Sequence, residues 1–305
     1  MSGKANLAAS VSARLLNRAK QTGDDHQNLL TTYCLERFLY RLSQSPISER
    51  FVLKGAMLLR VWADQPYRAT RDLDLLRHGD GAHDSIREDL LTIIQTPVTR
   101  DGVSFDGDRL TMDTIRAEDE YSGTRAKLPT RCGQARLTLQ LDLGLGDAVW
   151  PAPIPCTFPT LLNFPAPQLL SYPREAVVAE KLEAMVVLGN RNSRIKDFFD
   201  LHHLAGEFKF DRTTLTEAVR RTFERRGTPI PTVAPIGLTP AYWEDPTRPT
   251  QVTAFARRAG LEVPEKPGES IGRRLQTFLT PLLEDLRSGR GSPGSWSPER
   301  QEWVG

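Results

Sequence analysis

The stretch R-A-T-R-D-L-D-L-L at residues 68–76 decides the fold, and it follows F-V-L-K-G-A-M-L-L at residues 51–59. Alternate residues of a strand point to the same side, so Asp72 and Asp74 share one face while the neighbouring leucines enter the core. Two carboxylates at this spacing can hold one or two hard cations such as Mg²⁺, which keeps waters and substrate phosphates as ligands. A bare D-x-D is also typical of an exposed strand edge, so the motif alone does not decide the function.

A third carboxylate lies in the strand predicted for R-L-T-L-Q-L-D-L-G-L-G at residues 136–146. Its leucines alternate with Thr138, Gln140 and Asp142, so the leucines form an apolar face and Asp142 lies on the opposite one. If this strand neighbours the D-x-D strand, three carboxylates converge. Such a set suits two metal ions about 3.5–4 Å apart, which clamp the attacking and leaving oxygens of a phosphoryl displacement.

The ordered set of motifs resembles one protein family, the AbiEii-type nucleotidyltransferase toxins, a branch of the DNA polymerase β-like nucleotidyltransferase superfamily. The resemblance extends from about residue 12 to about residue 285. The segments that carry it are L-K-G-A (53–56), R-A-T-R-D-L-D-L (68–75), L-D-L-G-L-G-D (141–147), A-E-K-L-E-A-M (179–185) and R-I-K-D-F-F-D-L (194–201).

The resemblance implies metal-dependent transfer of a nucleotide from an NTP to a hydroxyl, in a cleft between a mixed-sheet core and a helical lobe. Asp72, Asp74 and Asp142 are then the catalytic ligands of two Mg²⁺ ions, and Asp142 also helps to deprotonate the attacking hydroxyl. One feature departs from the superfamily, which has Gly-Ser or Gly-Gly where this chain has Gly55-Ala56. A serine contact to phosphate is lost, so we expect backbone N–H groups at the following helix start to bind phosphate instead.

Lys181 is placed in an apolar row of the helix predicted to end at Gly189. One interpretation is that its stem covers apolar surface while the ammonium reaches water. With the resemblance, we expect Lys181 to neutralise triphosphate charge, with Arg71 assisting.

The next predicted helix carries Lys196, Asp197 and Asp200. The two aspartates are three residues apart and share a face, and Lys196 and Asp200 are four apart and can pair. Asp197 is also favoured near a helix start by the helix dipole alone. The resemblance makes this helix part of the nucleotide site, and the sequence does not distinguish which aspartate faces it.

We predict an α+β fold: a nucleotidyltransferase-like mixed sheet core with an N-terminal helical segment and a C-terminal helical lobe. The N-terminal helices are expected to break at residues 22–25, and the proline-rich stretch 151–173 is expected to be an extended connector. The last residues are rich in Gly, Ser, Pro and charge, which predicts disorder. The expected parts are the helical segment 1–50, the core 51–170, the helical lobe 171–287 and the disordered tail 288–305.

The composition, 39% hydrophobic and 26% charged residues among 305, is ordinary for a globular protein. A formal charge of +2 does not by itself indicate nucleic-acid binding, although arginines cluster at Arg68 and Arg71 and again at residues 220–226. Three scattered cysteines without C-x-x-C exclude a disulfide framework and fit a reducing cytoplasm. No signal peptide or stretch of about 18 apolar residues is visible, so we expect no membrane span.

Members of the family that this chain resembles are toxins of toxin–antitoxin pairs, and some transfer nucleotides to the 3′ end of tRNA. Their partner is an AbiEi-like DNA-binding antitoxin. We therefore expect a toxin that uses an NTP to modify the tRNA 3′ end and that a cognate antitoxin neutralises. Two alternatives stay open: a nucleotidyltransferase acting on a protein or a small molecule, and a catalytically decayed NTP- or RNA-binding protein. The Gly55-Ala56 turn is the only support for decay.

Overall fold

The computed structural model describes residues 2–62, 68, 70–116, 122–147, 149–189 and 194–305. The chain divides into two compact units. The first comprises Met1–Gly146 and Ile154–Ser171, and the second comprises Asp147–Pro153 and Tyr172–Gly305. Residues 1–50, which the sequence suggested as a segment of their own, belong to unit 1.

Unit 1 is built on one mixed sheet, as the sequence predicted. Its strands run in the order β3-β5-β6-β2-β1-β8-β7, and β4 also pairs with β5. Strand β2 is parallel to β6 and antiparallel to β1, so β2 lies between two strands of opposite direction. The strands are β1 Phe51–Lys54, β2 Asp72–Arg77, β3 Val103–Phe105, β4 Thr111–Arg116, β5 Ser122–Cys132, β6 Ala135–Leu145, β7 Ile154–Thr157 and β8 Gln168–Ser171.

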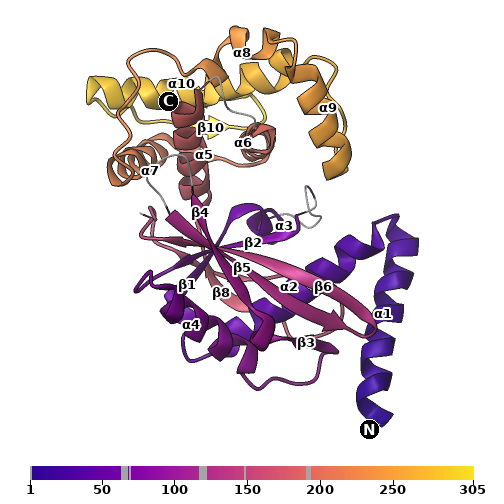
Figure 1. The fold of residues 1–305 in the computed structure, drawn as a ribbon. Helices are drawn as coiled ribbons and strands as arrows, with labels where there is room; N and C mark the ends of the chain where they lie inside the picture. Colours follow the sequence, from indigo (N-terminus) through magenta and orange to yellow (C-terminus); the bar gives the residue numbers. More distant parts are fainter. Residues whose placement is uncertain (1, 63–67, 69, 117–121, 148, 190–193) are drawn as a thin grey trace. The chain divides into compact units, whose positions relative to one another are not determined.

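The two faces of this sheet differ in polarity because the strand sequences alternate. Leu139, Leu141 and Leu143 of β6 are buried, whereas Thr138, at an alternate position of the same strand, is exposed. Helix α2 (His26–Gln44) packs against β5, β6 and β8 and covers the apolar side (Figure 1). Period-2 alternation therefore positions the polar residues of β2, β5 and β6 together on the opposite side.

The helices of unit 1 begin with the predicted pair. Helix α1 ends at Thr22 and α2 begins at His26, which confirms the expected break. Asp25 caps α2, since its carboxylate accepts the N–H of Asn28 at 2.8 Å. The remaining elements are α1 Ser2–Thr22, η1 Ser48–Arg50, η2 Gly55–Met57, α3 Leu58–Trp62, α4 His83–Gln95 and η3 Gly107–Arg109.

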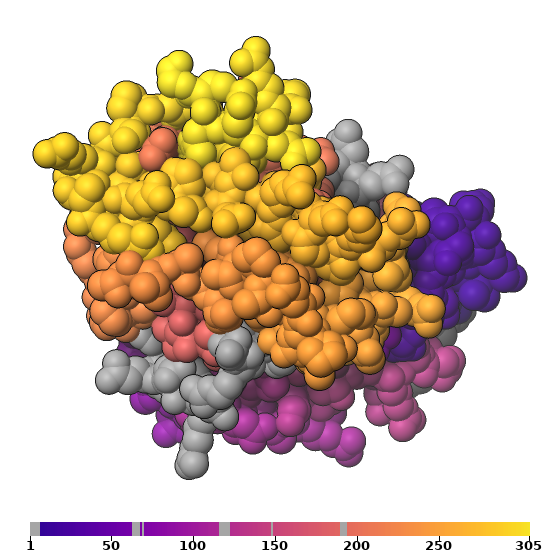
Figure 2. Space-filling model, turned by 90° about the horizontal axis from the view of Figure 1, so that it is seen from above, coloured from indigo at the N-terminus to yellow at the C-terminus, as the bar shows by residue number. Residues whose placement is uncertain are grey.

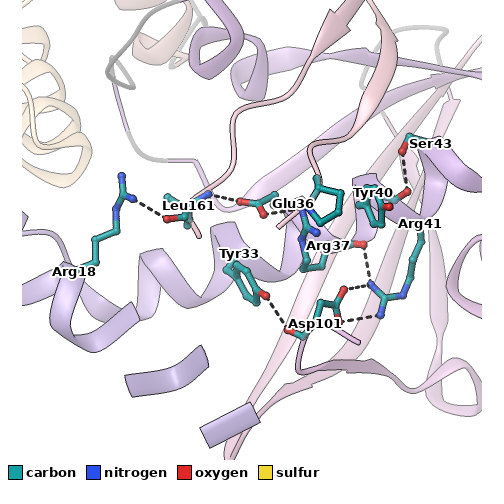
Figure 3. Close-up of polar contacts among 10 residues, drawn as sticks. Arg18, Tyr33, Glu36, Arg37, Tyr40, Arg41, Ser43, Asp101 and Leu161 are labelled. Atoms are coloured by element: carbon teal, nitrogen blue, oxygen red, sulfur yellow. Dashed lines mark hydrogen bonds and ion pairs between the residues drawn. The ribbon is translucent and has the colours of Figure 1, made fainter. Parts of the chain in front are cut away.

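Buried polar groups of α2 hold two loops of unit 1 in place (Figure 3). Glu36 accepts the backbone N–H of Leu161 at 2.6 Å, and Arg37 donates to a carbonyl of the same loop. Arg41 forms a bidentate ion pair with Asp101, with N–O distances of 2.7 and 3.1 Å. The proline-rich connector expected from the sequence is therefore fixed to unit 1 over part of its length.

Unit 2 is mainly helical, as predicted for the lobe. Its last long helix, α10, buries the predicted stripe that includes Leu275, Phe278 and Leu282. The elements are α5 Arg174–Leu188, α6 Ile195–Glu207, β9 Phe210–Asp211, α7 Arg212–Arg225, η5 Ile236–Leu238, α8 Pro240–Glu244, α9 Arg248–Ala259, η6 Gly268–Gly272, α10 Arg273–Ser288, β10 Ser295–Ser297 and β11 Glu302–Val304. None of the helices in the described ranges is long and apolar enough to cross a membrane.

The C-terminal residues contradict the predicted disordered tail. Strands β10 and β11 form a hairpin that pairs with β9. Trp296 is 0% exposed and donates its indole N–H to the carbonyl of Ala205 at 2.7 Å, while Trp303 stacks on Phe278. In Figure 2 the yellow C-terminal residues form one continuous surface with the residues before them. Two tryptophans bury enough apolar area to order a segment whose composition otherwise favours disorder.

Candidate active site

The three predicted carboxylates lie on one face of the sheet in unit 1. Asp74 of β2 is the register partner of Asp142 of β6, and Asp72 is the partner of Gln140. Register partners in neighbouring strands lie about 4.7–4.9 Å apart and point to the same side. Leu73, between the two aspartates of β2, and Leu75, after them, are fully buried, as expected. The parallel β2–β6 pairing thus places Asp142 beside the D-x-D strand.

The turn after β1 is packed directly against Asp74. Gly55 has φ +71°, a conformation that favours glycine, and a Cβ built on it would stand 2.0 Å from Oδ2 of Asp74. Lys54, the residue before the turn, is the register partner of Asp74 in β1. The chain then continues through the single turn η2, which contains Ala56, into the five-residue helix α3. Glycine at position 55 is therefore required by the close approach of the Asp74 side chain.

Arg125 of β5 belongs to this polar face, and the sequence analysis missed it. Its Nε and Nη2 donate to the two carboxylate oxygens of Asp142 at 2.8 and 2.7 Å. The hydrogen bond to Asp142 raises the pKa of Arg125, and the charges of Asp142, Asp72 and Asp74 add to the effect against a smaller loss from burial. The signal was present in R-A-K-L-P-T-R-C (125–132), where cations alternate with residues that the structure buries.

The donor set on this face suits a hard divalent cation. Asp72 and Asp74 offer carboxylate oxygens from one strand, and Asp142 offers two more from the neighbouring strand. Within the described ranges, however, no group of three or more Asp, Glu, His or Cys side chains is arranged to hold a metal ion. Both oxygens of Asp142 accept hydrogen bonds from Arg125. The oxygen chemistry therefore fits Mg²⁺, while the third carboxylate is engaged elsewhere.

Unit 2 contains a second cluster of predicted residues. Nζ of Lys181 donates to Oδ1 of Asp197 at 2.6 Å and to Oδ2 of Asp200 at 2.8 Å. Arg194 contacts the other oxygen of Asp197 at 2.9 Å. Lys181 comes from α5 and the aspartates come from successive turns of α6, so helix packing brings them together. Both aspartates therefore face Lys181.

This cluster is a buried charge pair rather than a lysine that reaches water. The side chain of Lys181 is 14% exposed, and those of the two aspartates are almost fully buried. Burial opposes the charge of Lys181, but Asp197 and Asp200 outweigh it and raise the lysine pKa. Burial likewise opposes the charge of Asp197, yet Lys181 and Arg194 lower its pKa. Lys181 and Asp197 are therefore ionised at neutral pH.

The remaining predicted residues lie outside these two clusters. Arg71 is exposed and donates from Nε to Oδ1 of Asn28 at 2.8 Å. Lys196 lies on the exposed side of α6, whereas Asp200, its predicted partner, faces Lys181. Arg71 directly precedes β2 along the chain.

Three arginines of the cluster at residues 220–226 form ion pairs with acidic groups. Arg220 pairs with Glu217 and Glu224, and Arg221 also pairs with Glu217. Arg226 is largely buried and bridges three acidic side chains, those of Asp147, Glu180 and Glu183. The charges of Arg220, Arg221 and Arg226 are therefore compensated within unit 2.

Comparison with known proteins identifies the class. Residues 37–281 match the family described as "Nucleotidyl transferase AbiEii toxin, Type IV TA system". The match spans most of the chain and includes the D-x-D strand, β6, Lys181 and the lysine–aspartate helix. The protein is thus a nucleotidyltransferase, and it belongs to the AbiEii family of type IV toxin–antitoxin systems. No curated protein matches it at a significant level.

Two solved structures are similar to this chain, both from Helicobacter pylori. The crystal structure of JHP933 shares 15% sequence identity, with a TM-score of 0.46 and coverage of 87% of this chain and 95% of that one. A proposed nucleotidyltransferase also shares 15% identity, with a TM-score of 0.47 and coverage of 88% and 100%. Our assignment rests on the family match and on the residues of this chain.

Proposed function

We propose that this protein transfers a nucleotide from an NTP to an acceptor hydroxyl at the polar face formed by β2 and β6. The observation that carries the proposal is the register of Asp74 with Asp142, with Asp72 on the same side and the Gly55 turn packed against Asp74. Three carboxylates beside a tight turn suit the binding of a metal-bound triphosphate. No covalent nucleophile is needed, because positioning and charge neutralisation carry this chemistry.

Asp72 and Asp74 would hold a divalent cation, and Asp142 would complete a second cation site. Mg²⁺ is the ion we propose, since it prefers oxygen ligands and shares its shell with substrate phosphates. Bound there, the ions would neutralise charge on the transferred phosphoryl group and lower the pKa of the attacking hydroxyl. Asp142 would then accept the proton of that hydroxyl.

Lys181 is held by the two aspartates of α6. Two of its three N–H donors bind Asp197 and Asp200. The group formed by Lys181, Arg194 and the two aspartates carries no net charge, so Lys181 is not a source of excess positive potential. We propose that Asp197 and Asp200 hold the ammonium of Lys181 in one fixed orientation within unit 2.

The acceptor we propose is the 3′ end of tRNA. Support comes from exposed cations on the carboxylate face: Lys127 lies two residues after Arg125 on β5, and Arg131 lies four residues further on. Alternate residues of a strand are about 6.6 Å apart, which is close to the separation of successive phosphates in an extended nucleic-acid strand. The partner we propose is a cognate AbiEi-like, DNA-binding antitoxin; the match to a toxin of a type IV toxin–antitoxin system supports an antitoxin as the partner.

The test is to incubate the protein with each α-labelled NTP, Mg²⁺ and total RNA, and to follow label in RNA, protein and small molecules. We expect labelled tRNA. Labelling should fall steeply with salt, with a log–log slope near −0.7 for each phosphate contact of a single-stranded end. Salt-insensitive labelling of another acceptor would refute the tRNA assignment and leave nucleotidyl transfer standing.

Two variants separate the carboxylate site from general charge effects. Asp72→Asn should abolish labelling while the protein stays folded, because it removes a ligand charge and opens no cavity. Asp113→Asn is the matched control, since Asp113 is the register partner of Arg125 in β4 and pairs with exposed Lys127. Asp113→Asn should label at nearly the wild-type level. Full activity of folded Asp72→Asn would refute the proposed site.

A further inference from the structure

Arg125 connects the proposed cation site to a third strand. It is the register partner of Asp142 in the antiparallel β5–β6 pair, just as Asp74 is its partner in the parallel β2–β6 pair. One lateral row therefore contains Asp74, Asp142 and Arg125, with Asp142 in the middle. The side chain of Asp142 is 17% exposed, and that of Arg125 is 38% exposed. Arg125 is thus more exposed than Asp142, and the row continues beyond it to Asp113, its register partner in β4.

The contact between Arg125 and Asp142 has the geometry of a strong, specific pair. Two parallel N–H···O bonds of 2.8 and 2.7 Å use both carboxylate oxygens, and planar bidentate pairing is the strongest form of arginine–carboxylate contact. The amide of Gln140 donates to the same Oδ2 at 3.4 Å. A divalent cation that approaches Asp142 meets a guanidinium charge and oxygens that are already hydrogen-bonded.

The guanidinium has chemistry that suits a second partner. Arginine binds phosphate with the same fork of N–H donors that binds a carboxylate. A nucleotide triphosphate arriving at this face would offer such oxygens to Arg125. Transfer of the guanidinium from carboxylate to phosphate would expose Asp142 at the moment the nucleotide is present.

We propose that Arg125 is a positioning residue that occupies Asp142 in the nucleotide-free protein and releases it to a divalent cation when a triphosphate binds. The inference rests on the proposed function, because it assumes that the carboxylate face holds the cation. Its consequence is a coupling between two ligands. A nucleotide increases the affinity for the cation, and by thermodynamic reciprocity the cation increases the affinity for the nucleotide by the same factor.

The chain offers a matched control for the charge of Arg125. Lys127 lies two residues further along β5 on the same face, is exposed and pairs with Asp113 at 3.1 Å. Lys127→Gln removes one positive charge from the face and leaves the Asp142 contact intact. Arg125→Gln removes the same charge together with the bidentate contact. Arg125→Lys keeps the charge and loses the fork.

The experiment measures Mn²⁺ binding to the full chain by calorimetry and electron paramagnetic resonance, with and without a non-hydrolysable NTP analogue. Without nucleotide, Arg125→Gln should bind Mn²⁺ about tenfold more tightly than the wild type, as expected for loss of one strong charged contact. Lys127→Gln should change little, and Arg125→Lys should be intermediate. The analogue should increase Mn²⁺ affinity strongly in the wild type and only weakly in Arg125→Gln.

Two results would overturn the inference. One is unchanged or weaker Mn²⁺ binding by folded Arg125→Gln; the other is an equal gain in Lys127→Gln, which would reduce the effect to net charge. Asp72→Asn distinguishes this failure from failure of the proposed function. If Asp72→Asn loses Mn²⁺ binding while Arg125→Gln behaves as wild type, only the role of Arg125 is refuted. If Asp72→Asn retains full Mn²⁺ binding, the cation site and the role of Arg125 both fail.

Discussion

Gly55 and Asp74 approach each other so closely that a Cβ on residue 55 would stand 2.0 Å from Oδ2 and 2.6 Å from Cγ of the aspartate. The turn after β1 and the second aspartate of the D-x-D motif are therefore one structural unit. Any side chain at position 55 must displace the carboxylate or the turn. The glycine of the turn is therefore needed on steric grounds, to leave room for the Asp74 side chain, in addition to any chemical role of the turn.

Gly55→Ala should consequently lose activity and stability together. The φ of +71° alone costs about 1–2 kcal/mol for a residue with a Cβ, and displacement of Asp74 adds to that cost. Gly23→Ala is the control, since Gly23 has φ +77° with no atom within 4 Å of its added Cβ. Denaturant unfolding and NTP transfer would be measured for both. A Gly55→Ala protein as stable and active as Gly23→Ala would contradict the steric argument.

The sequence predicted the polar faces of β2 and β6 because alternation is local and visible. It could not predict that β2 pairs with β6, since the pairing joins residues about 70 positions apart along the chain. Arg125 was missed for the same reason, because its contact with Asp142 depends on the register between β5 and β6. Lys181 was recognised as anomalous in its apolar row, but its partners lie on the following helix and only packing brings them within 2.6–2.8 Å.

Lys181→Ala should destabilise the protein, whereas a lone lysine in an apolar row would be replaced by alanine at no cost. The variant leaves the buried Asp197 and Asp200 without the charge of Lys181, while Arg194 still contacts Asp197. Removing one partner of a buried ion pair costs about 3–5 kcal/mol. Denaturant unfolding of Lys181→Ala checks this value.

Two further variants test whether the loss of stability in Lys181→Ala comes from the buried charges. Lys196→Ala, an exposed substitution on α6, should change the free energy of unfolding by no more than about 0.5 kcal/mol. Adding Asp197→Asn and Asp200→Asn to Lys181→Ala should recover much of the lost stability, because no buried charge then remains. Stability of Lys181→Ala equal to that of Lys196→Ala would show that the ion pairs contribute little.

The pH dependence of stability should carry a contribution from Glu36. Burial raises its pKa from 4.5 to about 7, against the opposing charge of Arg37. Because the folded pKa lies above the unfolded value, the folded state binds this proton more tightly. The contribution is therefore full below about pH 4.5, declines as the pH rises and is lost above about pH 7. Its total is at most about 3 kcal/mol, from 1.36 kcal/mol for each pKa unit.

Glu36→Gln tests this assignment through the slope of stability against pH, not through its absolute value. The variant should lose the decline between pH 4.5 and 7, even if it is less stable because glutamine cannot accept from both Arg37 and the backbone of Leu161. Glu88→Gln, an exposed change on α4, should keep the wild-type slope. An identical slope in Glu36→Gln and the wild type would show that another group dominates.

Deletion of residues 290–305 should lower the melting temperature of the protein, because the hairpin completes a sheet and fills a core. Trp296 is fully buried among the aromatic rings of unit 2, with Phe278 at 4.8 Å and Trp303 at 5.6 Å between centroids. Trp296→Ala alone should cost about 3–5 kcal/mol, the range for loss of a large buried ring. Glu302→Ala, at an exposed position of β11, is the control. Scanning calorimetry of the truncated and full-length chains measures the contribution of the hairpin to stability. An unchanged melting temperature would mean that the hairpin contributes nothing. A decrease matched by Trp296→Ala would assign most of the stabilisation to one indole ring.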